Sequence, residues 1–476
     1  MRIRLFGQYV HVSIAALAVV EALVFFGAML LAFRVRFGTW YPVTSTVSGN
    51  SLTVSGNTLW ICAAVFGAVN LISLLAFGLY SSRQRARTFG VFVRLVMAVA
   101  AAGVVTAAVF YSVPDLLLGR GVLALSSLFA LVGAGLSRGV SRLVVDESLF
   151  KRRVLVYGVG QRTAAIVGLR RRSDRRGFEI LGFVQPTGET ASPSVPAERI
   201  LDASGGILEL CTRLDVQEIV VAMEDRRRGF PILGLLECRL AGVDVTELLT
   251  FLERETGRVR IDVMNPSWMI FGDGFRRDPL RLFSSRALDL VASVVLVILS
   301  LPVMVLTMLA IKLEDGWHAP MFYGQARVGL GGQTFTVLKF RSMRTDAERD
   351  GQAQWAQKSD PRVTKVGAVI RKLRIDELPQ IFNVLAGHMS FVGPRPERPQ
   401  FVAELAQKIP YYVQRHCVKP GITGWAQLCY PYGSSEQDAL EKLQYDLYYI
   451  KNNTLLFDLA ILVQTAEVVF MGKGAR

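Results

Sequence analysis

Residues that build metal centres or disulfide frameworks are few in this sequence. Its 476 residues include five cysteines and four histidines, and no two cysteines form a CxxC or similar pair. The dispersed residues are Cys62, Cys211, Cys238, Cys417, Cys429, His11, His318, His388 and His416. A disulfide scaffold and a zinc site made of close ligand pairs are therefore excluded, and we assign no catalytic role to histidine.

Acidic residues are fewer than basic residues. The chain has 54 Lys and Arg against 39 Asp and Glu, a formal net charge of +15. No zinc-finger, helix-turn-helix or RNA-binding signature accompanies this charge, so nothing indicates an element that reads bases. The basic residues stand beside apolar segments, as cytoplasmic membrane anchors do, and we expect no nucleic-acid partner.

Apolar residues make up 51% of the chain. Four runs in its first third approach the roughly 20 residues that a helix needs to cross hydrocarbon. They lie at residues 10–33, 59–80, 91–113 and 122–140. The first has no convincing cleavage site and indicates a retained anchor. The sequence therefore predicts a four-helix transmembrane bundle over residues 1–145.

Basic residues flank two of these helix ends. They are Arg83, Arg85 and Arg87 in one loop, and Arg138, Arg142, Lys151, Arg152 and Arg153 at the exit. Both flanks are predicted to be cytoplasmic, although Arg34 and Arg36 argue against this topology. The uncharged residues 41–57 predict an exposed strand or loop outside the membrane.

The sequence pattern changes after residue 150. Short β-branched runs at 154–157, 180–184, 218–222 and 243–246 alternate with helical stretches, which predicts a Rossmann-like parallel sheet over residues 150–265.

The turn at 158–164 partly matches a dinucleotide-binding loop. Thr163 replaces the third glycine, and Gln185 stands where an acidic residue would bind ribose. We favour a scaffolding or regulatory domain over a cofactor site.

A fifth apolar run, 288–311, contains Pro302 near its middle. Proline removes a backbone donor and bends a helix. A full crossing would put everything after Lys312 outside the cell, away from cytoplasmic nucleotides. We therefore predict a re-entrant membrane helix at 286–312 that breaks at Ser300 to Pro302, with an ordinary kinked span as the alternative.

Beyond residue 320 the chain carries groups suited to phosphoryl chemistry. Asp376 and Glu377 are adjacent, so on a helix they could address one site in different roles. One would attack phosphorus and the other would hold a divalent ion. Mg²⁺ suits this setting because it needs only one or two carboxylates besides substrate phosphates.

Basic residues and a rigid turn accompany the two carboxylates. Lys339, Arg341, Arg374 and Arg395 could neutralise a diphosphate, although anchoring on anionic lipid is an alternative role for each of them. Pro394 and Pro396 predict a rigid turn that holds Arg395 in place.

These motifs closely resemble those of the bacterial polyprenyl-phosphate sugar-1-phosphate transferases, the large monotopic kind that initiate exopolysaccharide and glycoconjugate assembly. The resemblance spans essentially the whole chain, including the organisation of long members linked to exosortase-associated systems. It is most specific after residue 285. The matching motifs are KFRSM at 339–343, DPRVTKVG at 360–367, RIDELPQIFNVL at 374–385, FVGPRPE at 391–397 and PGITGWAQL at 420–428.

The resemblance implies a helix-rich catalytic domain at 280–476 and a mechanism. Asp376 would attack the β-phosphate of a UDP-sugar, expel UMP and form a phosphosugar-enzyme intermediate that undecaprenyl phosphate then attacks. Glu377 would bind Mg²⁺, Lys339 and Arg395 would contact phosphate, and Asp446 matches a further acidic position. A homodimer at the cytoplasmic face of the bacterial inner membrane is also implied.

Two positions depart from the family pattern. His388 replaces a usual Asp, and Leu301 separates Ser300 from Pro302 where many members have Ser-Pro. The final apolar run, 454–471, is interrupted by polar residues and predicts an interfacial helix. No residue indicates which sugar is transferred.

Two other functions are considered from the sequence. A membrane-tethered oxidoreductase or epimerase would use the sheet domain, which lacks the third glycine and the acidic residue. A non-catalytic scaffold for polysaccharide assembly would not need the intact DE, KFRSM and GPRP groups.

Overall fold

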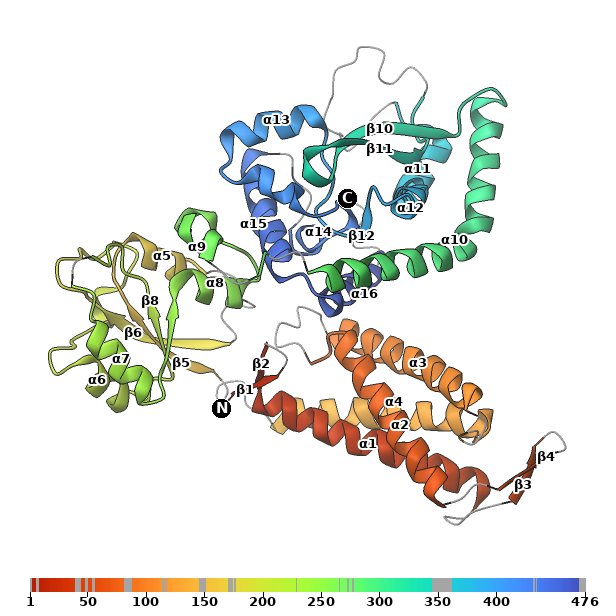
Figure 1. The fold of residues 1–476 in the computed structure, drawn as a ribbon, viewed down its shortest axis with the longest axis horizontal. Helices are drawn as coiled ribbons and strands as arrows, with labels where there is room; N and C mark the ends of the chain where they lie inside the picture. The colour runs from red at the N-terminus through yellow and green to blue at the C-terminus, as the bar shows by residue number, and fades with distance from the viewer. Residues whose placement is uncertain are drawn as a thin grey trace. The chain divides into compact units, whose positions relative to one another are not determined.

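The computed structural model divides the chain into two compact units, Met1–Phe251 and Leu252–Arg476 (Figure 1). The structure describes residues 2–5, 8–38, 44–47, 50–53, 56–80, 88–113, 116, 118–144, 151–169, 174, 177–227, 229–264, 266–271, 274–275, 278–344, 362–430, 433 and 435–470.

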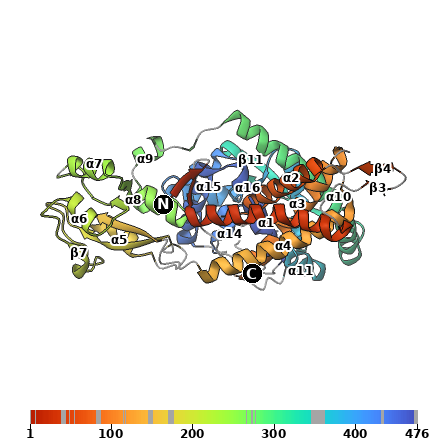
Figure 2. The same ribbon diagram turned by 90° about the horizontal axis from the view of Figure 1, so that it is seen from below.

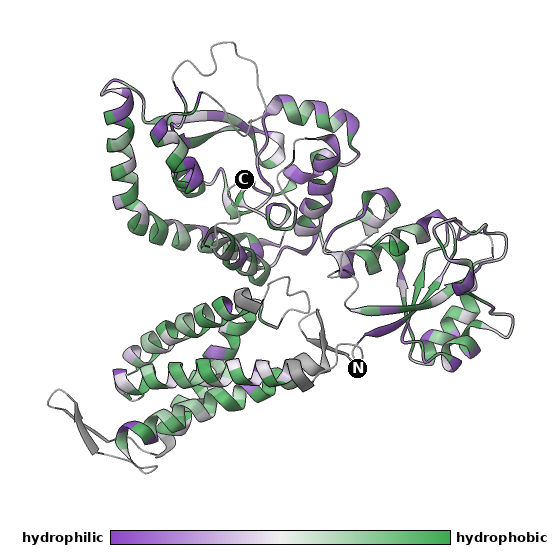
Figure 3. Cartoon of the chain, turned by 180° about the vertical axis from the view of Figure 1, so that it is seen from behind, coloured by the Kyte–Doolittle hydropathy of each residue, from purple (hydrophilic) through white to green (hydrophobic). Residues whose placement is uncertain are grey.

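The first unit begins with four long apolar helices. They are α1 (Val12–Phe37), α2 (Gly56–Ala76), α3 (Thr88–Ser112) and α4 (Arg120–Val144). Helices α1 and α3 each pack against both α2 and α4, and α1 and α4 lie side by side in Figures 1 and 2. All four are long and apolar enough to cross a membrane, and Figure 3 colours them mainly hydrophobic. The four predicted runs are confirmed as helices.

A buried ion pair crosses the core of these helices. Arg138 of α4 donates from Nε and Nη2 to the two carboxylate oxygens of Glu21 in α1, at 2.6 and 2.9 Å, and Tyr80 also donates to Glu21. Arg152 is likewise buried and paired with Glu218. Two arginines of the predicted basic exit are therefore buried, and each neutralises a buried carboxylate.

Two small antiparallel hairpins belong to the same unit. Strands β1 (Arg2–Leu5) and β2 (Gln8–His11) form one, and β3 (Thr44–Val47) and β4 (Asn50–Thr53) form the other. The second hairpin confirms the predicted strand within 41–57. The basic loop with Arg83, Arg85 and Arg87 lies outside the described residues.

A five-stranded parallel sheet completes the first unit. Its strands are β5 (Arg152–Tyr157), β6 (Phe178–Val184), β7 (Ile200–Leu201), β8 (Glu218–Val221) and β9 (Asp244–Glu247), and its helices are α5 (Gln161–Val167), α6 (Ile207–Arg213) and α7 (Ile232–Leu240). The boundary between the two units falls within the next helix, α8 (Leu248–Thr256). The strand order is β7-β6-β5-β8-β9, the doubly wound order of Rossmann folds. The predicted parallel sheet is confirmed. Only the two-residue β7 was missed.

The second unit is rich in short helices. Its elements are α9 (Pro266–Phe271), α10 (Pro279–Asp315), β10 (Phe322–Val328), β11 (Thr334–Phe340), α11 (Lys365–Lys372), α12 (Gln380–Leu385), β12 (Ser390–Val392), α13 (Pro399–Lys408), β13 (Gly421–Thr423), α14 (Trp425–Cys429), α15 (Glu436–Asn452) and α16 (Leu455–Phe470). Strands β10 and β11 form an antiparallel hairpin that was not predicted, and β12 pairs in parallel with β13.

Both ends of the long helix α10 contact other elements of the second unit. Near its start, Asp289 accepts hydrogen bonds from Ser390 Oγ at 2.9 Å and the Phe391 amide at 3.0 Å. In its last turn, Glu314 accepts from the amides of Lys365 and Val366. A straight helix of 37 residues would measure about 55 Å. Figure 1 instead shows α10 turning sharply along its length.

Pro302 lies inside α10, and the helix continues through it. The helix is therefore continuous at Ser300 to Pro302, where a break was expected. Ser300 Oγ approaches Met304 Sδ at 3.5 Å, and Leu301 is 53% exposed. Most of the large apolar side chains of α10 are exposed, which suits a lipid environment.

Candidate active site

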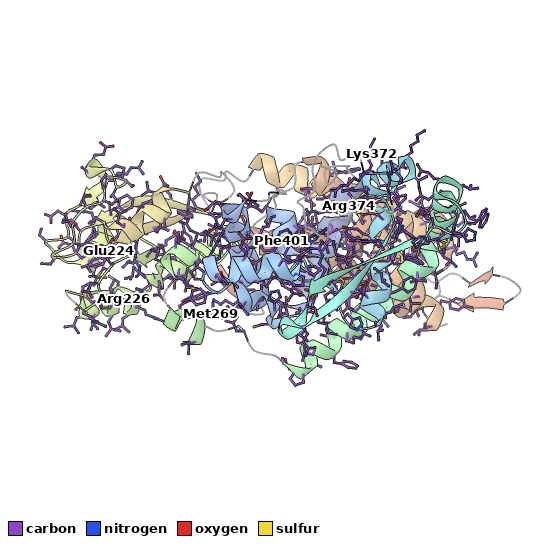
Figure 4. All side chains as sticks on the ribbon, turned by 90° about the horizontal axis from the view of Figure 1, so that it is seen from above. Glu224, Arg226, Met269, Lys372, Arg374 and Phe401 are labelled. Carbon is purple, nitrogen blue, oxygen red and sulfur yellow. The ribbon has the colours of Figure 1, made fainter. Side chains whose placement is uncertain are left out.

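The two adjacent carboxylates lie in a 3₁₀ turn, η7 (Ile375–Glu377), between α11 and α12. A regular α-helix, the geometry considered for the pair from the sequence, does not form at these two residues. Arg374 precedes the turn with a left-handed φ of 60°, a conformation that non-glycine residues rarely adopt. Such strain costs about 1–3 kcal/mol and is often found at functional sites. Arg374 lies at the end of α11 in Figure 4.

Local contacts fix the start of α11, which leads into the turn. Thr364 caps α11 by accepting from the Gly367 amide at 2.9 Å. A Cβ at Gly367 would lie 2.0 Å from the Ser342 carbonyl oxygen, so only glycine allows α11 to approach the KFRSM segment this closely.

Asn383 joins the other side of the turn to the hairpin. Its Oδ1 accepts from the Leu338 amide at 2.9 Å, and its Nδ2 donates to the Thr336 carbonyl at 2.8 Å. Because Asn383 is on α12 and both partners are on β11, these bonds fix β11, and with it Lys339, relative to the carboxylates.

Glu377 is surrounded by positive charge. Its Oε1 lies 3.2 Å from Lys339 Nζ, 3.0 Å from Arg395 Nη2 and 3.5 Å from Arg374 Nη1. Burial alone would raise the pKa of Glu377, but Arg395, Lys339 and Arg374 together hold it well below its ordinary value. Glu377 is therefore ionised across the physiological range.

Asp376 has the opposite environment although it is the next residue. It is buried, and burial followed by the neighbouring charge of Glu377 raises its pKa, with Lys339 and two arginines opposing. Environments that push two carboxylate pKa values apart assign different roles to them. The more basic Asp376 suits a nucleophile, and the permanently ionised Glu377 suits a charge-balancing group.

The carboxylates also meet the modest requirements of Mg²⁺. Across the described residues, no group of three or more His, Cys, Asp or Glu side chains converges. Mg²⁺ does not need one, because it retains waters and shares substrate phosphates. All three cationic contacts of Glu377 within the described part of the chain reach Oε1. Arg371 adds a further positive charge near Asp376, so the cations exceed the two carboxylates, and an anionic diphosphate would balance this excess. The donor set therefore fits Mg²⁺ together with a diphosphate.

The turn that carries Arg395 is held by hydrogen bonds to its backbone. Pro394 O accepts from the Gly421 amide at 2.9 Å, and Pro396 O accepts from Arg327 Nη1 at 3.1 Å. Arg395 therefore reaches Glu377 from a fixed backbone, as its neighbouring prolines led us to expect.

Two predicted site residues do not contact the carboxylate pair. Arg341 lies just past β11, its guanidinium interacts electrostatically with Asp315, and within the described residues its buried Nη1 has no hydrogen-bond partner. Asp446 is buried on α15 and forms an ion pair with Arg415 at 2.9 Å. The structure thus brings Lys339, Arg374 and Arg395 to Glu377, but not these two.

Sequence reasoning missed the residues that assemble the site from distant segments. Arg286 donates to the carbonyls of Val384 and Leu385 at the end of α12, and Asp289 joins α10 to β12. A carboxylate at the start of the apolar run 288–311 was a signal for Asp289, since such groups are costly in a membrane helix unless paired. His388, the family departure, packs beside Phe335 with ring centroids 6.0 Å apart.

The glycine turn of the sheet domain is occupied by acidic side chains. The Gly160 amide donates to Glu189 Oε1 at 3.1 Å, and the Gln161 amide donates to Glu224 Oε1 at 2.5 Å (Glu224 is labelled in Figure 4). Gly158 serves packing, because its Cβ would lie 2.7 Å from the Ala222 carbonyl carbon. The amides that would bind a dinucleotide phosphate therefore already have anionic partners.

Comparison with known proteins identifies the second unit. The model of the family described as bacterial sugar transferase matches residues 280–472. A relative from Bacillus subtilis (strain 168), provisionally named an undecaprenyl-phosphate N-acetylgalactosaminyl 1-phosphate transferase, is 49% identical over 130 residues, 27% of this chain and 71% of that protein. The chain belongs to the bacterial sugar transferases.

Longer relatives extend the match of this bacterial sugar transferase. The UDP-N-acetylgalactosamine-undecaprenyl-phosphate N-acetylgalactosaminephosphotransferase of Aeromonas hydrophila is 44% identical over 242 residues, 51% of this chain and 56% of that protein. The UDP-glucose:undecaprenyl-phosphate glucose-1-phosphate transferase of Xanthomonas campestris pv. campestris is 28% identical over 506 residues, 99% of this chain and 96% of that protein. The apolar helices and the sheet domain thus lie within a whole-length similarity.

Proposed function

We propose that this bacterial sugar transferase transfers a sugar 1-phosphate from a UDP-sugar to undecaprenyl phosphate and releases UMP, the first membrane step of exopolysaccharide or glycoconjugate synthesis. The observation that carries the proposal is the buried Asp376 beside Glu377, which Lys339, Arg374 and Arg395 surround. The names of the Aeromonas and Xanthomonas relatives support the donor and acceptor classes.

The chemistry takes place in two steps at one phosphorus atom. An oxygen of Asp376 attacks the β-phosphorus of the UDP-sugar, the bond from this phosphorus to the bridging oxygen breaks, and UMP leaves. A phosphate oxygen of undecaprenyl phosphate then attacks the same phosphorus, and the bond to Asp376 breaks. The product is an undecaprenyl diphosphate sugar, and the Asp376 carboxylate is restored.

The cationic side chains act on the developing charge. Lys339 and Arg395 neutralise the diphosphate and the departing UMP, Arg395 from a turn that is fixed before substrate binds. Arg374 and Arg341 lie at the rim and beside the hairpin, where they would contact the same anion. Mg²⁺, when bound by Glu377 with Asp376 beside it, would supply further positive charge for the phosphates.

Membrane seating follows from the same proposal. The helices α1 to α4 would cross the bacterial inner membrane as a bundle, and α10 would enter it and return at Pro302. Both ends of α10 contact one unit, which supports the return to the same face. Helix α16 would lie at headgroup depth, and both large domains would face the cytoplasm. A homodimer remains a prediction.

Purified protein in proteoliposomes tests the proposal. With Mg²⁺, undecaprenyl phosphate and a panel of UDP-sugars, we expect UMP release with at least one donor and a matching lipid-linked product. UMP release must depend on the lipid phosphate once turnover exceeds one per enzyme. No UMP from any donor, with the protein folded and inserted, would contradict the proposed reaction.

A further inference from the structure

Asp446 and Arg415 form the most buried ion pair among the described residues of the second unit. Both residues lie near the catalytic groups. Their side chains are 3% and 6% exposed, and Arg415 Nη2 lies 2.9 Å from Asp446 Oδ2. The pair does not contact Asp376 or Glu377. Burying two charges is costly, so a second reason for the pair is needed besides stability.

The second contact of Arg415 supplies that reason. The same Nη2 donates to the Arg395 carbonyl oxygen at 3.0 Å. Arg395 in turn donates to Glu377 Oε1 at 3.0 Å. Two arginines therefore connect Asp446 to the carboxylate of Glu377. Arg415 is held through its side chain, and Arg395 is held through its backbone carbonyl.

Tyr412 restricts the remaining conformational freedom of the Arg415 side chain. Its hydroxyl accepts from Arg415 Nη1 at 2.8 Å, and its ring lies 5.2 Å below the guanidinium carbon. A planar guanidinium that is bonded on two nitrogens and stacked on a ring has one orientation, which lysine could not reproduce.

We propose that Arg415 and Asp446 are positioning residues of the phosphate-transfer site: they fix the carbonyl of Arg395, and so the direction in which Arg395 approaches Glu377 and the substrate diphosphate. Asp446 thus acts through Arg415 and makes no substrate contact. The kinetic effect of these two residues rests on the proposed function. Their structural effect on the turn at 393–397 follows from the contacts alone.

The chain offers a matched control on the same helix. Glu441 is also on α15 and forms an ion pair with Arg258, but neither residue contacts the turn at 393–397. Asp446→Asn and Glu441→Gln therefore remove comparable charges from one helix, and only the first should affect the turn. Tyr412→Phe is a milder third variant that keeps the ring and removes the hydroxyl.

The first arm of the test is hydrogen exchange on the full chain in nanodiscs. The amides of Gly393, Arg395, Glu397 and Arg398 should exchange faster in Asp446→Asn and, to a smaller extent, in Tyr412→Phe, but not in Glu441→Gln. Unchanged exchange in both Asp446→Asn and Tyr412→Phe would overturn the inference. This arm needs no substrate, so it decides the inference even if no UDP-sugar is turned over and the proposed function fails.

The second arm is a double-mutant cycle on UMP release. Asp446→Asn should lower kcat by about 10- to 100-fold, as loss of a supporting contact does. In an Arg395→Ala background the same change should have less than about a twofold effect, because its route through Arg395 is gone. If Asp446→Asn instead lowers kcat by the same factor in both backgrounds, Asp446 acts on substrate directly, and the inference is overturned.

Discussion

The glycine turn of the sheet domain and the basic cluster of the second unit both carry sequence features of phosphate binding, yet their charges are arranged in opposite ways. At the turn, backbone donors of Gly160 and Gln161 are bonded to the carboxylates of Glu189 and Glu224. At the cluster, the carboxylate of Glu377 is bonded to Lys339 and Arg395. The first arrangement presents negative charge to an incoming phosphate, and the second presents positive charge.

This difference shows that a phosphate-binding motif indicates an anionic ligand only when the net charge around its donors favours an anion. A phosphate at the turn would have to displace two acidic side chains, whereas a diphosphate at the cluster meets an excess of positive charge over the two carboxylates. We therefore locate the chemistry in the second unit.

Asp376→Asn should produce the largest effect. The amide keeps the shape of the side chain but cannot attack phosphorus, so UMP release should fall by on the order of 10⁴-fold or more. The measurement is initial UMP release from purified protein in proteoliposomes, with melting of the variant as a control for folding. Activity within about tenfold of the unmutated protein would remove the nucleophile from Asp376.

Arg395→Ala should produce the next largest effect, about a 10²-fold loss in kcat/KM, because one preorganised charge on the diphosphate is removed. Arg226→Ala is a suitable control, since this exposed arginine of the sheet domain is paired with Glu247 (Arg226 is labelled in Figure 4). Equal losses in the two variants would mean that general charge, and not the cluster, determines activity.

Activity at the second unit's cluster should also depend on pH, because Asp376 is ionisable. Asp376 must be ionised to attack, and burial and Glu377 raise its pKa, so activity should fall on acidification at a pH above the ordinary Asp value of about 3.9. Arg371 lowers this pKa, so Arg371→Gln should raise it and move the acid limb of kcat/KM to higher pH. A limb that stays in place or moves to lower pH would contradict the assignment.

The combined change Glu189→Gln and Glu224→Gln should have the smallest effect, within about twofold on UMP release, because the sheet turn takes no part in the reaction. The unmutated chain should also fail to bind NAD⁺ in isothermal titration in nanodiscs. Tight NAD⁺ binding, or a large activity loss in the double variant, would break the contrast between the two regions.

The sequence predicted the elements well and the long-range contacts poorly. Apolar length and β-branched alternation indicated α1 to α4, α10 and the parallel sheet, since these patterns arise from local periodicity. The motifs also indicated Lys339 and Arg395 as phosphate contacts, and the structure brings both side chains to Glu377. Arg341 lies just past the end of β11 at Phe340 and does not reach the carboxylates, so its predicted contact with the diphosphate stays a prediction.

Contacts between distant segments could not be predicted from one sequence. Asp289 and Ser390 are 101 residues apart and Arg415 and Asp446 are 31 apart, and neither pair has a periodic signal. The left-handed Arg374 was equally hidden, because nothing in its residue type favours a positive φ.

The most direct measurement is mass spectrometry of the enzyme after incubation with Mg²⁺ and a UDP-sugar that supports UMP release, in the absence of undecaprenyl phosphate. The account predicts one added sugar phosphate, located on Asp376 by fragmentation, which disappears when the lipid phosphate is supplied. UMP release without a covalent adduct, or an adduct on any residue other than Asp376, would contradict it.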